Sequence, residues 1–431
     1  MRLKRMFNIR LAVAVIFSVA LSLSVHGQLP DTLTLDFCHE RAVEVWPLSI
    51  QKNLYEQASD MEMENISKNY LPRFDLNGRA TYQSEVTKVE VNMPGVDIPS
   101  PDKDMYNLYL GLNQLIWDGG ISRNQKILEQ ADLEISKQQV EVELYQVKSR
   151  VNGLFYKILL YRQSRDLLVV NRETVSEKLQ ELESAIRHGV MLQSDADAMQ
   201  AQILEIDQKV AEIDSDLAAH YRMLGQMLEM DIPESTELLM PDPEVQTQSF
   251  VNLRPEYHLL EMQKNRLELS KELVSASYLP KFSGFGKLGY GKPGLNMLSD
   301  KFDTYYYLGV GLQWDILNWN KQKNQKKILD VQQEIIEAQR RAFDKNIDVQ
   351  VTDDLAEIRK YEQLMEKDQQ IIDLRERITK TASSKLDSGT ITSSQYLDEV
   401  NRETRTRLDL EMHRIQLSLA KIDYLKTIGE L

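Results

Sequence analysis

The stretch RHGVMLQSD, residues 187–195, separates two long runs of heptad-spaced apolar residues. The stretch DSGTITSSQ, residues 387–395, repeats this design 200 residues later. Each stretch places a glycine, Gly189 or Gly389, before residues with hydroxyl or carboxylate side chains. Glycine adopts the positive φ that ends a helix, and Ser, Thr or Asp caps the next helix. Each stretch therefore predicts the tip of an antiparallel helical hairpin.

Further matches show that the whole chain is duplicated. YLPRF at residues 70–74 matches YLPKF at residues 278–282, and NQK at residues 124–126 recurs at 324–326. Internal repeats of this kind indicate two copies of one structural unit. We expect a first repeat over residues 28–230, a connector over residues 231–253 and a second repeat over residues 254–431.

The first 27 residues predict a signal peptide, with a basic start and an apolar run that ends before Gln28. Without its four basic residues, the 52 Lys and Arg against 66 Asp and Glu leave a net charge of about −18. An acidic, exported chain argues against a nucleic-acid partner. The single cysteine, Cys38, allows no internal disulfide bond. After the leader no apolar run is long enough for a membrane helix, so any membrane entry requires strands.

Two segments change from helical spacing to strict alternation. Phe74, Leu76 and Tyr82 alternate with polar residues, and the pattern returns from Met105 to Trp117. The second repeat has the same pattern, so we expect β-hairpins at about 73–117 and 281–317, the latter with a strand from Tyr305 to Leu317. Strands of about ten residues have the length that a tilted membrane-spanning strand needs.

The runs around the tips have apolar residues at alternating steps of three and four, as in a coiled-coil seam. Residues 121–186 and 320–386 would form helices roughly 100 Å long at about 1.5 Å per residue. A returning helix follows each tip. The four seams comprise Val140, Leu144, Val147, Val151, Leu154 and Ile158; Ala196, Met199, Ile203, Ile206, Val210, Ile213 and Leu217; Ile328, Val331, Ile335, Ala338 and Ala342; and Leu408, Met412, Ile415, Leu419 and Ile422.

The predicted strands require copies of the chain. Four strands cannot close a barrel, and open strand edges are not tolerated in lipid. We therefore expect a homo-oligomer that shares one barrel in a lipid membrane, with a wet interior because one strand face is polar. We expect strand–helix junctions at Pro72, Pro280, Gly119 and Gly120 to place the helices directly below the barrel.

The chain resembles the TolC-like outer-membrane efflux protein family over essentially all of its mature length. The resemblance rests on residues 70–74 and 278–282, on LNQLIWDGG at residues 112–120, and on the two glycine-centred tips. It implies an α+β membrane protein that is built of duplicated helical hairpins and β-hairpins. The implied assembly is a homotrimer in outer-membrane lipid, and its barrel stands on a periplasmic helical tunnel. It also implies passive conduction of substrates from an inner-membrane pump through a periplasmic adaptor, in efflux or type I secretion.

The resemblance also implies that the tips form the closed gate and the docking surface for the adaptor. Gly189, Gly389, Ser194 and Ser394 lie in these turns. Family members have gate aspartates six and nine residues after the second glycine. Here those positions hold Gln395, which departs from the pattern, and Asp398, which fits it.

Two gate candidates have alternative interpretations. Asp195 resembles a family position in the first tip, but it also suits a cap of the returning helix. Asp398 either faces the pore or is simply solvated. A ring of Asp398 from several copies would concentrate cations.

The sequence predicts no enzyme, cofactor or metal centre. Its histidines are scattered and form no His-Glu-x-x-His arrangement, and Cys38 is alone. An exported coiled-coil filament or stalk is the alternative to a duct, but a filament does not need the alternating strands.

Overall fold

A computed structural model describes residues 32–87, 102–188, 191–245 and 252–431. The predicted signal peptide lies outside the described residues. The elements in chain order are β1 (Thr32–Leu33), α2 (Leu35–Val45), α3 (Ser49–Lys68), β2 (Arg73–Tyr82), β3 (Asp104–Trp117), α4 (Ile121–Arg187), α5 (Gln193–Leu228), β4 (Glu237–Leu238), α6 (Pro255–Ser277), β5 (Lys281–Lys292), β6 (Asp303–Gln313), α7 (Lys321–Asp387) and α8 (Ser393–Ile428).

Two compact units each draw on both sequence repeats. One unit contains the described residues up to 42 together with residues 151–242 and 361–419. The other contains residues 43–150, 243–360 and 420–431. Neighbouring helices and strands of a unit thus come from distant parts of the chain. The division of the sequence into two repeats and a connector stays a prediction.

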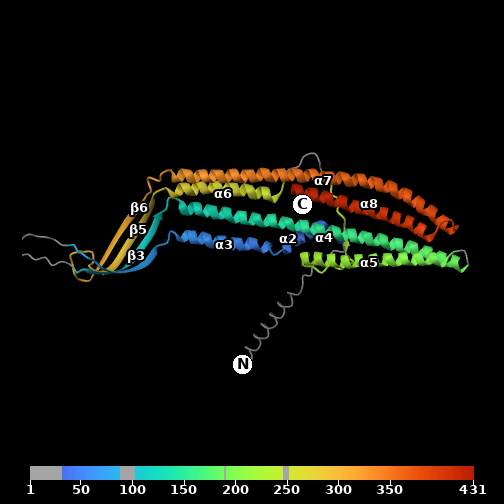
Figure 1. Cartoon of the computed structure of the whole chain (residues 1–431). Helices are drawn as coiled ribbons and strands as arrows, with labels where there is room; N and C mark the ends of the chain where they lie inside the picture. The colour runs from blue at the N-terminus through green and yellow to red at the C-terminus, as the bar shows by residue number, and fades with distance from the viewer. Residues whose placement is uncertain (1–31, 88–101, 189–190, 246–251) are drawn as a thin grey trace, which may run out of the picture. The chain divides into compact units, whose positions relative to one another are not determined.

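The second unit holds a four-stranded antiparallel sheet in the order β2-β3-β5-β6 (Figure 1). Phe74 pairs with Leu112, and Leu112 pairs with Gly286, so residues of one parity share one face. The even-numbered face carries the large apolar residues that the alternation predicts, and the odd-numbered face is mixed. Strands β2 and β6 are the edges of this sheet within the described residues.

Four helices of the same unit form a row that ion pairs connect. Lys137 of α4 pairs with Glu56 of α3 at 2.5 Å. Arg266 of α6 donates to Asp132 of α4 at 3.0 Å. Lys264 of α6 pairs with Glu337 of α7 at 3.2 Å. The row is therefore α3-α4-α6-α7, and α3 and α7 are its outer members.

The coiled-coil seams differ in how far this chain covers them. The seam of α4 is buried, with Val151 and Ile158 fully enclosed, and Met199 of α5 is equally buried. The seam of α7 is open, because Val331 and Ile335 are 54% and 53% exposed. Heptad spacing thus identified an apolar stripe on α7 that the described part of this single chain leaves exposed.

Local features mark two of the helix and strand ends. The helical run from Leu35 to Lys68 is interrupted between α2 and α3 around Pro47, since proline removes a helical hydrogen bond. Strand β6 ends at Gln313 rather than Leu317, although the alternation continues to Ile316. The positive φ of Trp319 and Asn320 marks the turn that follows. None of the described helices is long and apolar enough to cross a membrane.

Candidate functional site at the helical tips

Helix α7 ends in a hydrogen-bonded turn that requires a glycine. Gly389 has a φ of +67°. Its N–H donates to the carbonyl of Leu386 at 2.9 Å, and the N–H of Thr390 donates to the carbonyl of Lys385 at 2.9 Å. These two bonds form a Schellman motif, which satisfies carbonyls at the end of a helix. The corresponding Gly189 lies outside the described residues.

A reciprocal pair of hydrogen bonds caps the start of α8. The side-chain oxygen of Gln395 accepts from the N–H of Thr392 at 3.0 Å, and the Thr392 hydroxyl oxygen accepts from the N–H of Gln395 at 3.3 Å. This capping box satisfies two backbone donors that a helix start leaves free. Gln395, a gate candidate from the sequence, therefore has a structural role in the tip.

Asp195 also binds the start of α8, from the opposite hairpin. Its carboxylate accepts the N–H of Ser393 at 3.2 Å. Helix α5 itself has Leu192 at its N-cap, without a side-chain cap hydrogen bond, so the hydrogen bond of Asp195 serves the start of α8. Helix α5 begins at Gln193, so Asp195 lies within its first turn and its side chain reaches across to α8. The aspartate thus joins the two hairpins.

A buried lysine makes a second connection between the hairpins. Lys178 of α4 is 7% exposed and pairs with Asp387 at the end of α7 at 2.5 Å and with Glu181 at 2.7 Å. Its ammonium also lies 6.0 Å from the ring centre of Tyr396. Burial alone would lower the pKa of Lys178, but the hydrogen bonds to both carboxylates outweigh it and raise that pKa. Lys178 is therefore held in its charged form.

An apolar core from four helices lies beneath these polar contacts. It draws on α4, α5, α7 and α8, so both hairpins contribute to it. Burying this apolar surface favours the packed arrangement. Its buried members are Leu168, Val175, Leu179, Leu182, Ala196, Met199, Ile203, Ile206, Ala382, Leu386, Tyr396, Leu397 and Val400.

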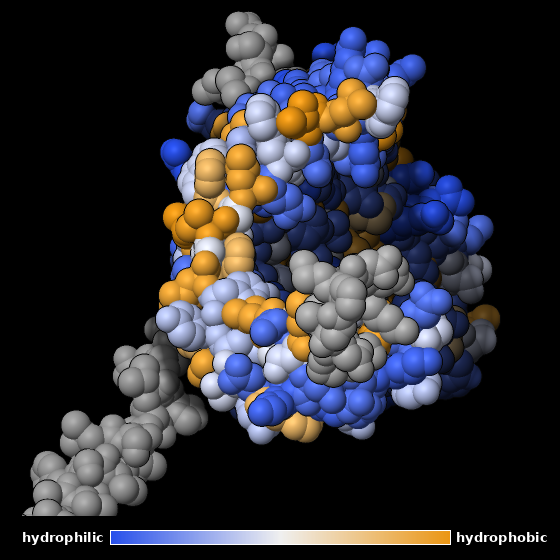
Figure 2. Space-filling model, turned by 90° about the vertical axis from the view of Figure 1, so that its left-hand side faces the viewer, coloured by the Kyte–Doolittle hydropathy of each residue, from blue (hydrophilic) through white to orange (hydrophobic). Residues whose placement is uncertain are grey.

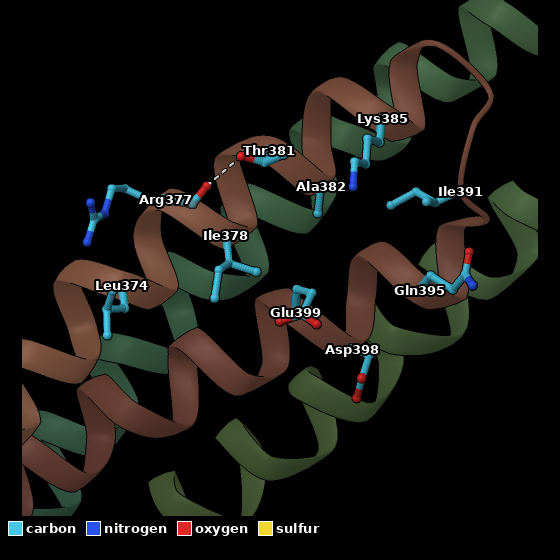
Figure 3. Close-up of a pocket in the computed structure, with 10 residues that line it drawn as sticks. All are labelled: Leu374, Arg377, Ile378, Thr381, Ala382, Lys385, Ile391, Gln395, Asp398 and Glu399. Atoms are coloured by element: carbon cyan, nitrogen blue, oxygen red, sulfur yellow. Dashed lines mark hydrogen bonds between the residues drawn. The ribbon is translucent and has the colours of Figure 1, made fainter.

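A groove of about 700 Å³ lies between the end of α7 and the start of α8 (Figure 3). Leu374 lies at one end of it, and Lys385 and Ile391 lie near the turn. Asp398 also lines the groove and pairs with Arg402 at 3.0 Å. The Asp398 side chain stays 59% exposed, so it remains available to solvent and ions. Apolar side chains such as Ile378 and charged ones such as Arg377 thus line the same groove.

Those predicted tip and gate residues that the structure describes thus lie in one region of one unit. Ser194 and Ser394 are exposed in the first turns of α5 and α8. Asp398 lines the groove, while Asp195 and Gln395 bind the backbone at the start of α8. Sequence reasoning did not identify Lys178 or Asp387. A lone lysine within a heptad run of 67 residues gives no signal of its partner 209 residues away.

The junction before α4 has an organiser that the sequence did not reveal. The Asp118 carboxylate accepts from the N–H of Gly120 at 2.9 Å, from the N–H of Ser122 at 2.7 Å and from the Tyr70 hydroxyl at 2.9 Å. Burial opposes ionisation, but these donors outweigh it and lower the pKa of Asp118. Gly119, at a φ of +76°, packs so closely on Leu279 that a Cβ would lie 2.8 Å away.

This close contact joins the strand-to-helix junction between β3 and α4 of the first repeat to the helix-to-strand junction between α6 and β5 of the second. Pro72 follows α3 and Pro280 follows α6, so both prolines precede strands as expected. Among the described residues, no group of three His, Cys, Asp or Glu side chains is arranged to hold a metal ion.

Comparisons with known proteins find likeness in structure alone. No family model matches the sequence, and no curated protein matches it significantly. The outer membrane protein VceC from Vibrio cholerae is 12% identical, with a TM-score of 0.66 over 92% of this chain and 96% of that one. The CmeC outer membrane channel of Campylobacter jejuni is 12% identical, with a TM-score of 0.63 over 92% and 85%.

The MtrE outer membrane channel of Neisseria gonorrhoeae, solved in an open state, is 14% identical, with a TM-score of 0.62 over 92% and 88% of the two chains. Agreement over nearly the full length of several channels establishes the fold. The expected fold class of helical hairpins with β-hairpins is thereby confirmed.

Proposed function

We propose, because the chain has the TolC-like fold of outer-membrane channels, that it is the outer-membrane exit duct of a tripartite efflux pump or a type I secretion system. It would be a homotrimer that conducts substrates passively. A periplasmic adaptor and an inner-membrane pump would deliver them. The duct performs no catalysis of its own in this proposal.

The apolar face of the open sheet carries this proposal. Leu76, Tyr306, Leu308 and Val310 are between 72% and 81% exposed. Figure 2, which faces the sheet end of the molecule, shows hydrophobic residues gathered in a band. Strands of 10 to 14 residues match the length that a tilted membrane strand needs. Lipid tails would cover this apolar face, whereas soluble proteins rarely expose an apolar patch of this kind to water.

The open edges of the second unit support assembly from several copies. β2 follows α3 in the chain and β6 precedes α7, so each open strand edge belongs with one outer helix of the row. Helix α3 exposes Ile50, Leu54 and Met61, and α7 exposes the Val331 stripe. A neighbouring copy that pairs β6 with β2 would also bring α7 against α3. One contact thus closes both layers, as repetition around an axis requires.

The groove at the tips supports the adaptor part of the proposal. It offers apolar side chains from α7, such as Leu374 and Ile378, beside charged residues of both helices. Another protein's helices could pack there with complementary charges. Asp398 is the remaining candidate for a gate that selects cations, because its carboxylate is exposed and not used as a cap.

The α7 stripe provides the test of the proposal. Ile335→Glu places a charge in the contact between copies, so we expect loss of the heat-dissociable oligomer and of conductance in planar bilayers. Gln332→Glu adds the same charge at an exposed polar position that flanks the stripe of the same helix, and we expect it to assemble and conduct much better than Ile335→Glu. Purification from the outer membrane precedes both measurements.

Two results would count against the proposal. If the wild-type protein were a soluble extended oligomer without conductance, the chain would be a filament or stalk. If Ile335→Glu assembled as well as Gln332→Glu, the α7 stripe would not be the contact between copies.

A further inference from the structure

The polar face of the sheet is positively charged, although the chain as a whole is acidic. The strand register places odd-numbered residues of all four strands on this face. The full chain has a net charge of −14, so the sign on this face is reversed. The charged residues on the face are the basic Arg73, Arg79, Lys281 and Lys287 and the acidic Asp75 and Asp303.

Lys287 lies between two aromatic rings in the middle of β5. Its ammonium is 4.5 Å from the ring centre of Tyr109 on β3 and 5.6 Å from that of Tyr307 on β6. The residue opposite it on β3 is Gly111, and the Asp75 carboxylate of β2 lies over this glycine, 2.7 Å from the place of an added Cβ. Such positions over ring faces hold a cation by cation–π attraction.

The nearest acidic residue on this face is already engaged. Asp75 accepts a hydrogen bond from the amide of Asn113 at 3.4 Å, and the amide of Asn77 also donates to it. Among the described residues, Lys287 has no carboxylate partner within ion-pair distance. The rings therefore orient its ammonium. Although the Asp75 carboxylate lies over the neighbouring Gly111, no ion pair of Lys287 has to break when an anion binds.

Further aromatic rings extend this surface along the strands. The Phe285 ring covers Gly309, where a Cβ would lie 2.5 Å from the ring, and Tyr305 covers Gly289 in the same way. The Tyr305 hydroxyl donates to Asn107 at 2.7 Å, which fixes that ring. Phe285 and Tyr307 meet edge to face, with ring centres 6.3 Å apart. Glycines thus let the rings lie flat on the sheet.

We propose that this face binds anionic aromatic solutes as they pass, with Lys287 meeting the anionic group and the neighbouring rings contacting the aromatic part. This inference rests on the proposed function, in which the polar face lines the channel. It assigns a substrate class to the sheet segment of the duct. Three copies would repeat the site around the channel.

Paired blockers in planar bilayers test the proposal. Naphthalene-2-sulfonate and 2-naphthylmethylammonium share a ring system and differ in the sign of charge. We expect the sulfonate to reduce the wild-type current at lower concentration than the ammonium. Lys287→Met keeps an apolar stem and removes the charge, so it should weaken the sulfonate block about tenfold, equivalent to about 1.4 kcal/mol.

Two variants control for position and for folding. Lys281→Met removes a charge from the same strand and face, and we expect it to change the sulfonate block less than about twofold. Lys287→Arg keeps the charge over the rings and should retain the block. All variants are compared as heat-dissociable oligomers of normal yield.

The possible outcomes separate this inference from the proposed function. An absence of conductance in the wild-type protein overturns the duct and the inference together. Conductance with equal block by both compounds, or with unchanged block in Lys287→Met, overturns only the inference. If Lys287→Met failed to assemble, loss of the sulfonate preference in Lys287→Arg would likewise overturn it.

Discussion

Asp354 is a carboxylate that the protein buries at some cost. It is 5% exposed and accepts hydrogen bonds from the Thr427 hydroxyl at 2.6 Å and from the Gln350 amide at 2.9 Å. Burial raises its pKa despite these bonds, and the charge of Asp423 acts in the same direction, while Lys426 opposes it. Because the folded pKa exceeds the unfolded value of 3.8, stability falls as pH rises through this window.

We therefore predict that Asp354→Asn stabilises the protein at neutral pH by on the order of 1 kcal/mol. The gain should shrink as pH falls toward the ordinary range of an aspartate, because the wild-type carboxyl is then protonated as well. Thermal unfolding of the detergent-solubilised protein at pH 7.5 and pH 4.5 measures it. The neighbouring Asp353 is exposed, so an equal gain from Asp353→Asn would contradict the explanation by burial.

The tip residues show what a single sequence reveals about a site. Gly389 was identifiable from local pattern alone, since a glycine between two helical runs has one common use. Asp195 and Gln395 were located correctly in the tips, but their partners were not predictable from the sequence. The bond from Ser393 to Asp195 spans 198 residues. Such contacts depend on how the hairpins pack, which residue spacing does not encode.

At the scale of elements, substitution of two glycines in the long helical hairpins by alanine distinguishes the effect of backbone strain from that of helix propensity. At both Gly389 and Gly153 an added Cβ would meet no atom within 4 Å, but only Gly389 has a positive φ. We expect Gly389→Ala to destabilise the tip by about 1–2 kcal/mol. Gly153→Ala should stabilise α4 by up to about 1 kcal/mol.

Hydrogen exchange measured on peptides around each position would report these opposite changes. Faster exchange near residues 385–395 in Gly389→Ala, with slower or unchanged exchange near residue 153 in Gly153→Ala, is the expected result. Slower hydrogen exchange near residues 385–395 in Gly389→Ala would exclude the Schellman turn as a determinant of tip stability.

The seams show where prediction from the sequence was limited at this scale. The step of three and four residues identified the buried stripe of α4 and the open stripe of α7 equally well. Periodicity identifies which residues share a face, but not whether the partner belongs to the same chain. The predicted end of the last strand at Leu317 was wrong for a related reason. The alternation of apolar residues continues past Gln313, where the pairing of β6 with β5 ends.

At the scale of the whole molecule, Asp398 tests whether the tips control conduction. The wild-type carboxylate is 59% exposed and, in the proposed duct, would bring one negative charge per copy to the ring of helical tips. Asp398→Asn should raise single-channel conductance and weaken block by Mg²⁺ at least about twofold, since the oxygen ligands that Mg²⁺ prefers lose their charge.

Asp373→Asn is the matched control for this experiment, because it neutralises an exposed carboxylate on α7 within the same unit. Equal effects of the two variants would mean that general surface charge, and not Asp398, determines the block. Unchanged block in Asp398→Asn would remove this residue from the gate.

The composition of the two units has a consequence for the order of folding. Each unit includes residues beyond position 400 as well as residues before position 45. Strand β1 at Thr32 must await its partner β4 at Glu237, and Tyr145 must await the carbonyl of Lys426. A chain exported from its N-terminus therefore cannot complete either unit until almost all of it has crossed. Contacts of such long sequence separation also form slowly. The emerging polypeptide thus needs protection from aggregation throughout its transit.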